Sequence, residues 1–320
     1  MCITRKKYGR GFQYFDEYGE KITSSKLLRR FRKLVIPPMW EAVKICKWPD
    51  GHIQATGRDP KGRKQYVYHS AWEQQRQQEK FNRMQSFGQR LPVVRRACQE
   101  RIAKTEKWNR EKVLSLMLLI LDETGIRIGN QEYAERNDTY GLSTLRRKHL
   151  SIARDQVVFE YQGKSGKRRH VAVEEPLLAQ HIQQVAERPG YEIFRYRNGY
   201  RDWENIDSDD VNAFIQRHAG EQFSSKDFRT WVASRLAVAY YPEAQARKAK
   251  YPRRQLVNIL LRLVAKELGN TPNVCRTHYI HPEVLDRVEK GDMLDSGEYP
   301  EDNAPHEHSR AERMLLDIIR

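Results

Sequence analysis

The chain has 320 residues, of which 31% are charged and 39% hydrophobic, and its formal net charge is +16. This length can build two domains with separate cores, and the apolar and aromatic content excludes a disordered basic tail. The excess of positive charge predicts a polyanionic partner, either nucleic acid or a membrane surface.

The positive charge is unevenly spread along the chain. Residues 1–90 sum to +12 and residues 91–280 to +10, whereas residues 281–320 sum to −6. No apolar run approaches the roughly 18 residues of a membrane span, and no secretory leader is recognisable. The four cysteines are scattered without a CxxC pair, which disfavours a zinc ribbon or a redox motif. We therefore expect a cytoplasmic protein with four free thiols and no membrane partner.

Residues 1–88 are expected to form a small β-rich domain with an antiparallel sheet and short helices. Alternating apolar and polar residues, bounded by Pro-Asp-Gly and Asp-Pro-Lys-Gly turns, predict strands at 9–16, 53–56 and 64–69. Helical patterns cover residues 26–33, 39–46 and, as a polar connector, 72–88. We place the domain boundary near residue 88.

Residues 89–320 are expected to form a mainly α-helical domain with a small β-hairpin. Helices are predicted at 91–105, 112–123, 228–240, 253–268 and 307–320. The segment 112–123 is apolar almost all round, which predicts a helix buried at the centre of this domain. Strand patterns at 156–161 and 169–173 flank a Gly-Lys-Ser-Gly turn, so Lys164 is expected at a hairpin tip. The fold class is therefore α+β in two domains.

Tyr279 follows the last long helical pattern and lies in a cationic segment. A single tyrosine is usually structural, so only a set of residues can indicate chemistry. An enzyme that attacks a phosphodiester without a metal needs a nucleophile, fixed cations at the phosphate oxygens and an acid for the leaving oxygen. Arginines such as Arg127 and Arg229 provide permanent charge. Lys164 is the candidate acid, because neighbouring cations favour release of its proton.

Other catalytic equipment is missing from the sequence. It contains neither HExxH nor GxxxxGK[ST], so zinc-protease and nucleotide-driven chemistry are unsupported. The acidic run Asp207-Ser-Asp-Asp210 has the pattern of a helix cap rather than of a metal site. We expect no metal and no cofactor. On these grounds alone, a non-catalytic architectural DNA-binding protein remains a possible alternative.

The ordered set Arg127, Lys164, Lys226-Asp-Phe-Arg229 and Tyr279 resembles the type IB DNA topoisomerases, in particular the small poxvirus-like and bacterial branch. The resemblance covers nearly the whole chain, including Gly57–Tyr68, Gly141–His149 and Gly269-Asn-Thr-Pro272. It implies a tyrosine-recombinase-like catalytic domain and a monomer whose two domains wrap duplex DNA. It also implies relaxation of supercoils through a 3′-phosphotyrosyl intermediate and religation, without ATP or metal.

The resemblance assigns roles by position. Tyr279 would be the nucleophile, Arg127 and Arg229 would hold the phosphate oxygens, and Lys164 would be the general acid. Lys226 would be a second cation for proton transfer or DNA contact. Viral and eukaryotic members have a histidine nine residues before the nucleophile, where this chain has Asn270. An amide can donate a hydrogen bond but carries no charge, so we expect a positional and electrostatic role for Asn270.

The resemblance also implies DNA contacts outside the catalytic set. Tyr133 stands where the viral enzyme has a base-contacting tyrosine, but Asn130 and Glu132 replace lysines, so the viral target sequence should not be carried over. Four positions of the first domain match DNA-contacting positions of the family: Arg63, Tyr66, Tyr68 and Arg76. Tyr66 and Tyr68 are two residues apart in a strand pattern, so they should lie on one face.

A tyrosine site-specific recombinase is the nearest rival, since it shares the phosphotyrosyl chemistry. Recombinases usually carry His-x-x-Arg where this chain has Lys226-Asp-Phe-Arg229, and their N-terminal domain is helical rather than β-rich. The topoisomerase interpretation therefore fits the residues better.

Overall fold

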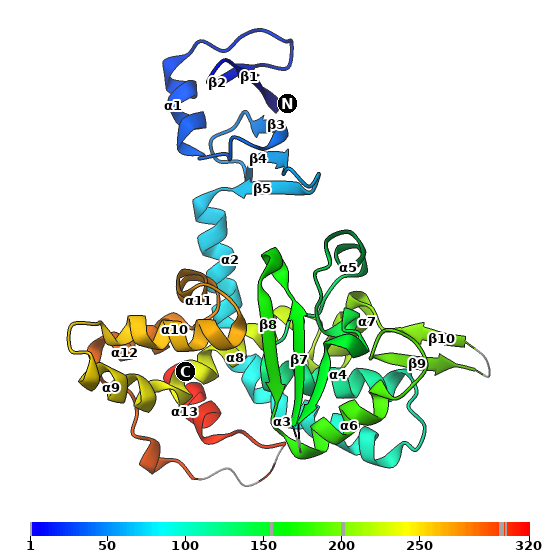
Figure 1. Ribbon diagram of the computed structural model, residues 1–320. Coiled ribbons are helices and arrows are strands. Elements are labelled where there is room, and N and C mark those ends of the chain that lie inside the picture. Colours follow the sequence, from blue (N-terminus) through cyan, green and yellow to red (C-terminus); the bar gives the residue numbers. More distant parts are fainter. Residues whose placement is uncertain (1, 154–155, 200–201, 301–303, 305) are drawn as a thin grey trace. The chain divides into compact units, whose positions relative to one another are not determined.

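The structure is a computed structural model that describes residues 2–153, 156–199, 202–300, 304 and 306–320 (Figure 1). Contacts along the chain divide it into two units, Met1–Lys80 and Phe81–Arg320. The division falls within helix α2 (Ser70–Asn82), ahead of the boundary expected near residue 88. Each unit has its own buried core.

The first unit is built on a five-stranded antiparallel sheet in the order β2-β1-β3-β4-β5, as expected for a β-rich domain. Its strands are β1 (Cys2–Tyr8), β2 (Gly11–Phe15), β3 (Glu41–Cys46), β4 (Ile53–Arg58) and β5 (Lys64–Tyr68). Helix α1 (Ser25–Lys33) covers the sheet and buries Phe31 against Ile3, Val43 and Ile45. This small core leaves much of the sheet to solvent and partners.

The helix predicted at 39–46 is wrong, because this segment forms strand β3 inside the sheet. Val43 and Ile45 are buried, while Ala42 and Lys44, which alternate with them, are exposed, so the side chains follow the two-residue period of a strand. Pairing with β1 and β4 outweighs the helix preference of the Glu, Ala and Lys residues here. Ala42 takes a φ of 47° at an irregularity in the pairing with β4, as at a β-bulge.

The second unit packs helices around a buried central helix, α4 (Arg110–Thr124). Val113, Leu116 and Leu121 are completely buried there, which confirms the prediction of a central helix. The other helices are α3 (Met84–Lys104), α5 (Gln131–Asn137), α6 (Pro176–Ala186), α7 (Ser208–Ala219), α8 (Ser225–Ala239), α9 (Tyr241–Lys250), α10 (Leu256–Leu268), α11 (Pro272–His278), α12 (Pro282–Lys290) and α13 (Arg310–Ile318). The Asp207 side chain caps α7 as predicted, accepting from the amides of Asp209 and Asp210. Short 3-10 turns lie at Leu142–Thr144, Arg147–His149, Lys164–Gly166 and Ser296–Glu298.

Two antiparallel sheets complete the second unit. Strands β6 (Leu150–Ala153), β7 (Gln156–Gln162) and β8 (Arg168–Val173) pair in that order, so the hairpin predicted around Lys164 is confirmed. A second hairpin, of β9 (Arg195–Asn198) and β10 (Asp202–Asn205), lies where no strand was predicted from the sequence. The Glu204 carboxylate, which accepts from Tyr196 and Asn198, links its two strands.

A buried ionic network ties the last helix into the core. Arg95 on α3 donates to Asp122 on α4 and to Glu312 on α13, with N···O distances of 2.5 and 2.6 Å. The indole of Trp231 on α8 also donates to Glu312, at 2.8 Å. Buried charges are tolerated only when paired and hydrogen-bonded in this way. None of the described helices is long and apolar enough to cross a membrane.

Candidate active site

The first cation of the predicted set lies just beyond the end of α4. Gly125 ends the helix with a left-handed φ of 59°, and a side chain there would press on Leu268. The carbonyl of Arg127 accepts from the amide of Leu142 at 2.7 Å, which fixes this turn. The half-buried Arg127 guanidinium then donates to Oδ1 of Asn270 at 2.5 Å.

Arg229 lies in the second turn of α8 and is 5% exposed. Its guanidinium donates to the carbonyls of Gly125 and of Leu268, the latter at 3.2 Å. Its Nε is buried and has no hydrogen-bond partner among the described residues. Burial, together with the charge of Arg127, lowers the Arg229 pKa to about 10. The side chain therefore stays positively charged at neutral pH.

The turn between α10 and α11 holds Asn270. Gly269 ends α10 with a left-handed φ of 62°, and the amide of Asn270 donates to the carbonyl of Ala265 at 3.0 Å. Because a guanidinium can only donate, the Asn270 atom that faces Arg127 must be the oxygen. The Asn270 Nδ2 is then left buried without a hydrogen-bond partner in the described part of the chain. We call Arg127, Arg229 and Asn270 the arginine cluster.

Tyr279 immediately follows α11 and lies against this cluster. Its amide donates to the carbonyl of Cys275 at 3.1 Å, and the Arg229 guanidinium lies 5.1 Å from the centre of its ring. Burial alone would raise the Tyr279 pKa, but Arg229, Arg127 and Lys164 oppose it and the net pKa is lowered. A phenol with a lowered pKa is more readily converted to the nucleophilic phenolate.

Lys164 lies at the exposed tip of the β7–β8 hairpin. Within the described residues its ammonium group makes no hydrogen bond or ion pair, and the neighbouring Ser165 takes a φ of 65°. Its charge nevertheless contributes to the lowered Tyr279 pKa. The structure therefore gathers Arg127, Arg229, Asn270 and Tyr279. Lys164 lies on the exposed hairpin turn beside them.

Lys226 and Tyr133 lie outside the buried cluster. Lys226 is exposed in the first turn of α8, and Tyr133 is 42% exposed on α5. Asn130 and Glu132 on either side of Gln131 have local roles. Asn130 caps α5 by accepting from the amide of Tyr133, and Glu132 pairs with Arg136 at 2.7 Å.

The predicted DNA-contacting residues of the first unit gather around stacked aromatic rings. The Tyr66 and Tyr68 rings stack with centroids 5.8 Å apart, which confirms that they share a face. Tyr68 also stacks on Trp72 at 4.5 Å. We call Tyr66, Tyr68 and Trp72 the aromatic ladder. Trp72 was not among the residues predicted from the sequence to contact DNA. Its position four residues after Tyr68, at the start of α2, could have indicated that the two rings lie close together.

The cations around the ladder are exposed and pair with nearby acids. Arg76 lies 5.9 Å from the Trp72 ring centre and pairs with Glu79 at 3.1 Å. Arg63 pairs with Asp59 at 2.6 Å in the turn before β5. Exposed pairs of this kind contribute little to stability.

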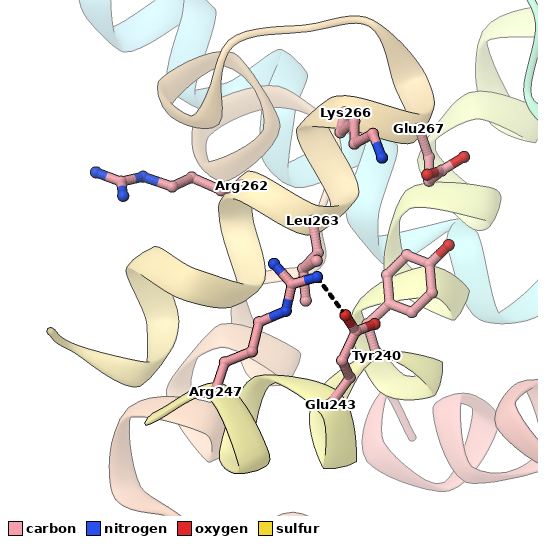
Figure 2. Close-up of a pocket in the computed structure, with 7 residues that line it drawn as sticks. All are labelled: Tyr240, Glu243, Arg247, Arg262, Leu263, Lys266 and Glu267. Atoms are coloured by element: carbon pink, nitrogen blue, oxygen red, sulfur yellow. Dashed lines mark ion pairs between the residues drawn. The ribbon is translucent and has the colours of Figure 1, made fainter. Parts of the chain in front are cut away.

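Two pockets of the second unit are lined by none of the predicted residues. One, of about 330 Å³, lies between α9 and α10 and contains an ion pair of Arg247 with Glu243 at 2.5 Å (Figure 2). The other, of about 730 Å³, is lined mostly by α8, α9, α13 and the segment after α12. The described residues contain no cluster of three or more His, Cys, Asp or Glu suited to a metal ion.

Comparison with known proteins matches nearly the whole chain. A family described as the catalytic core of eukaryotic DNA topoisomerase I matches residues 69–295, and one described as the N-terminal domain of bacterial DNA topoisomerase IB matches residues 11–59. The chain is 31% identical to the "DNA topoisomerase 1B" of Acanthamoeba polyphaga mimivirus over 99% of this chain and 94% of that protein. It is 24% identical to the "DNA topoisomerase 1B" of Vaccinia virus (strain Copenhagen) over 75% of this chain and 73% of the relative.

Proposed function

Because this chain belongs to the type IB DNA topoisomerases, we propose that it relaxes supercoiled duplex DNA through a covalent link between Tyr279 and a 3′ phosphate. The single observation that carries the residue assignment is the position of Tyr279. Its ring lies against Arg229, and its pKa is lowered by Arg229, Arg127 and Lys164 together, even though burial alone would raise it.

In the proposed reaction the Tyr279 oxygen attacks the phosphorus and the bond from phosphorus to the 5′ oxygen breaks. The phenol proton is lost to solvent, and Lys164 gives its proton to the leaving 5′ oxygen, which departs as a hydroxyl. A 3′-phosphotyrosyl ester remains, so the free end can rotate before the same steps in reverse reseal the strand. The ester conserves the bond energy, so religation draws on no nucleotide.

The arginine cluster would stabilise the charge that builds on the non-bridging oxygens. Arg229 Nε and Asn270 Nδ2 are buried donors that lack acceptors in the described part of the protein, and a phosphate would supply them. Donors that are fixed before the reaction cost no reorganisation during it, and each contributes on the order of 10²–10³ in rate. Lys226 and Tyr133, both exposed, are proposed to contact DNA beside this site.

The aromatic ladder and the cations beside it, Arg63 and Arg76, are proposed to bind DNA from the first unit. We also propose that the protein acts as a monomer. The match to a bacterial N-terminal domain supports a bacterial protein acting at the nucleoid in the cytoplasm.

The proposal is tested with purified protein and supercoiled plasmid in excess EDTA without nucleotide. We expect full relaxation, and a covalent adduct on Tyr279 that mass spectrometry locates after nuclease digestion. Tyr279→Phe should still bind DNA but should neither relax it nor form the adduct. Full relaxation by the Phe variant would contradict the assignment and favour an architectural role.

A recombinase would give a different result in the same assay. It would join two separate sites and would leave a circle that lacks those sites supercoiled. Relaxation of any plasmid by the protein alone would exclude that alternative.

A further inference from the structure

Arg169 on β8 is buried, whereas its neighbours Lys167 and Arg168 are exposed. Its guanidinium donates to the carbonyls of Glu267 at 2.6 Å and Lys266 at 3.4 Å. These carbonyls belong to the last turn of α10, where backbone acceptors lack most of their helical partners and carry partial negative charge. The carbonyl of Lys266 also accepts from the amide of Gly269, at 3.3 Å. A strand residue thus caps the helix that leads to Asn270.

Two glycines make room for this side chain. A Cβ at Gly163 would lie 2.8 Å from Cγ of Arg169, and a Cβ at Gly269 would collide with its guanidinium. The aliphatic part of the Arg169 side chain therefore packs against Gly163, and its guanidinium packs against Gly269. Gly163 directly precedes Lys164, and Gly269 directly precedes Asn270. The Arg169 side chain therefore packs against the residue before each of these two site residues.

The end of α10 is held by arginines on consecutive carbonyls. Arg169 binds the carbonyls of residues 266 and 267 from the hairpin, and Arg229 binds the carbonyl of Leu268 from α8. Arg127 then binds the side chain of Asn270, two residues further on. Arg169 is the member of this series that comes from the strand after Lys164, so it connects the proposed acid to the arginine cluster.

We propose that Arg169 is a positioning residue that fixes the Lys164 hairpin against the Gly269-Asn270 turn, so that the acid stays aligned with the leaving oxygen. It donates to backbone carbonyls and does not need to touch DNA. Among the described residues, Lys164 itself makes no hydrogen bond or ion pair. Its position therefore depends on the backbone of the hairpin on which it lies. This inference rests on the proposed function of the same site.

The test uses Arg169→Met, which keeps a stem of similar length and removes the donors. Single-turnover cleavage is measured on a normal strand and on one whose bridging 5′ oxygen is replaced by sulfur. A thiolate leaves without a proton, so its departure does not depend on an aligned acid. We expect at least a tenfold loss on the oxygen substrate and less than a threefold loss on the sulfur substrate, the pattern also expected of Lys164→Ala.

Three variants act as controls. Arg217→Met changes an arginine that pairs with Glu111 on the surface of the same unit, and it should cleave both substrates at the wild-type rate. Lys266→Ala removes a side chain that lines the pocket in Figure 2 but keeps the carbonyl that Arg169 binds, so it should also behave as wild type. Arg169→Lys retains one charged donor and should recover part of the lost rate, and it serves as the test variant if Arg169→Met does not fold.

Equal losses on the oxygen and sulfur substrates would overturn the inference, because a general distortion slows both. Wild-type rates for Arg169→Met on the oxygen substrate would overturn it as well. The proposed function fails separately, if the wild-type protein forms no adduct on Tyr279.

Discussion

The arginine cluster of the second unit and the aromatic ladder of the first both present cations, but they hold them differently. In the cluster, Arg229 is 5% exposed and is fixed by backbone carbonyls from two turns. Beside the ladder, Arg63 and Arg76 are exposed and pair with acids three or four residues away. Fixed, buried charge suits the stabilisation of a transition state, whereas exposed pairs suit binding that can be made and broken. We therefore expect changes in the cluster to alter rate and changes in the ladder to alter affinity.

The largest effect short of removing the nucleophile should come from Arg229→Gln. It removes the charge nearest to Tyr279, so single-turnover cleavage at saturating DNA should slow by about 10²–10³. The dissociation constant for DNA should stay within a few fold of the wild-type value. Arg217→Gln is a control, because that arginine pairs with Glu111 on the surface of the same unit. A large loss of DNA affinity in Arg229→Gln without a loss of cleavage rate would contradict the expectation that the arginine cluster controls rate.

The next effect concerns the amide group of Asn270. Asn270→Asp keeps the shape and the oxygen that accepts from Arg127, but replaces the unpartnered amide donor by a negatively charged oxygen. We expect cleavage to slow by about 10²-fold, since loss of one such donor typically costs that much. Asn270→His restores a donor and should cleave faster than Asn270→Asp. If the Asp variant cleaves at the wild-type rate, Asn270 plays no electrostatic part.

The third prediction concerns pH. The Tyr279 pKa is lowered, so its phenolate becomes populated at a lower pH than that of a free tyrosine, and cleavage should rise with pH up to that point. Arg229→Gln removes a lowering influence and should move the rise to higher pH. Difference absorbance near the tyrosinate band, wild type minus Tyr279→Phe, measures the ionisation directly. A Tyr279 pKa above the free-tyrosine value of about 10 would contradict the structure.

The smallest effect should come from the ladder. Tyr68 stacks on both Tyr66 and Trp72, so Tyr68→Ala removes both ring pairs at once. Aromatic pairs of this kind contribute about 1 kcal/mol of free energy. If this energy fixes the rings in the conformation that binds DNA, its loss lowers DNA affinity about fivefold. Cleavage at saturating DNA should not change. Tyr18→Ala is the matched control, since that ring is 82% exposed in the same unit. A slower cleavage step in Tyr68→Ala would erase the distinction between the regions.

Local patterns in the sequence predicted much of the fold. The apolar stretch of α4, the turn at Lys164 and the Asp207 cap are each encoded by a short run of consecutive residues, and all three are present. Strand β3 was mistaken for a helix because its character comes from pairing with β1 and β4, which lie elsewhere in the sequence. The β9–β10 hairpin was missed for a related reason, since its strands are short and polar.

The candidate site divides in the same way. The resemblance to a family, carried by residue types and their order, predicted Arg127, Lys164, Arg229, Asn270 and Tyr279. The structure gathers four of them with Lys164 nearby, and their roles stay predictions. The burial of Arg169 could not be foreseen, because it depends on Gly163 and on a helix end almost 100 residues later. In the sequence it was one more cation beside Lys164.

The buried network around Glu312 has a consequence for how the protein opens. Glu312 accepts from Arg95 and from Trp231, and the helix of Trp231 also carries Arg229. Opening α13 would separate Glu312 from Arg95 and would leave the buried indole N–H of Trp231 without its acceptor, so it should occur only when the whole unit unfolds. Amide protons of α13 should therefore exchange with solvent deuterium about as slowly as those of α4. Helix α13 should therefore stay folded as long as the rest of the unit does.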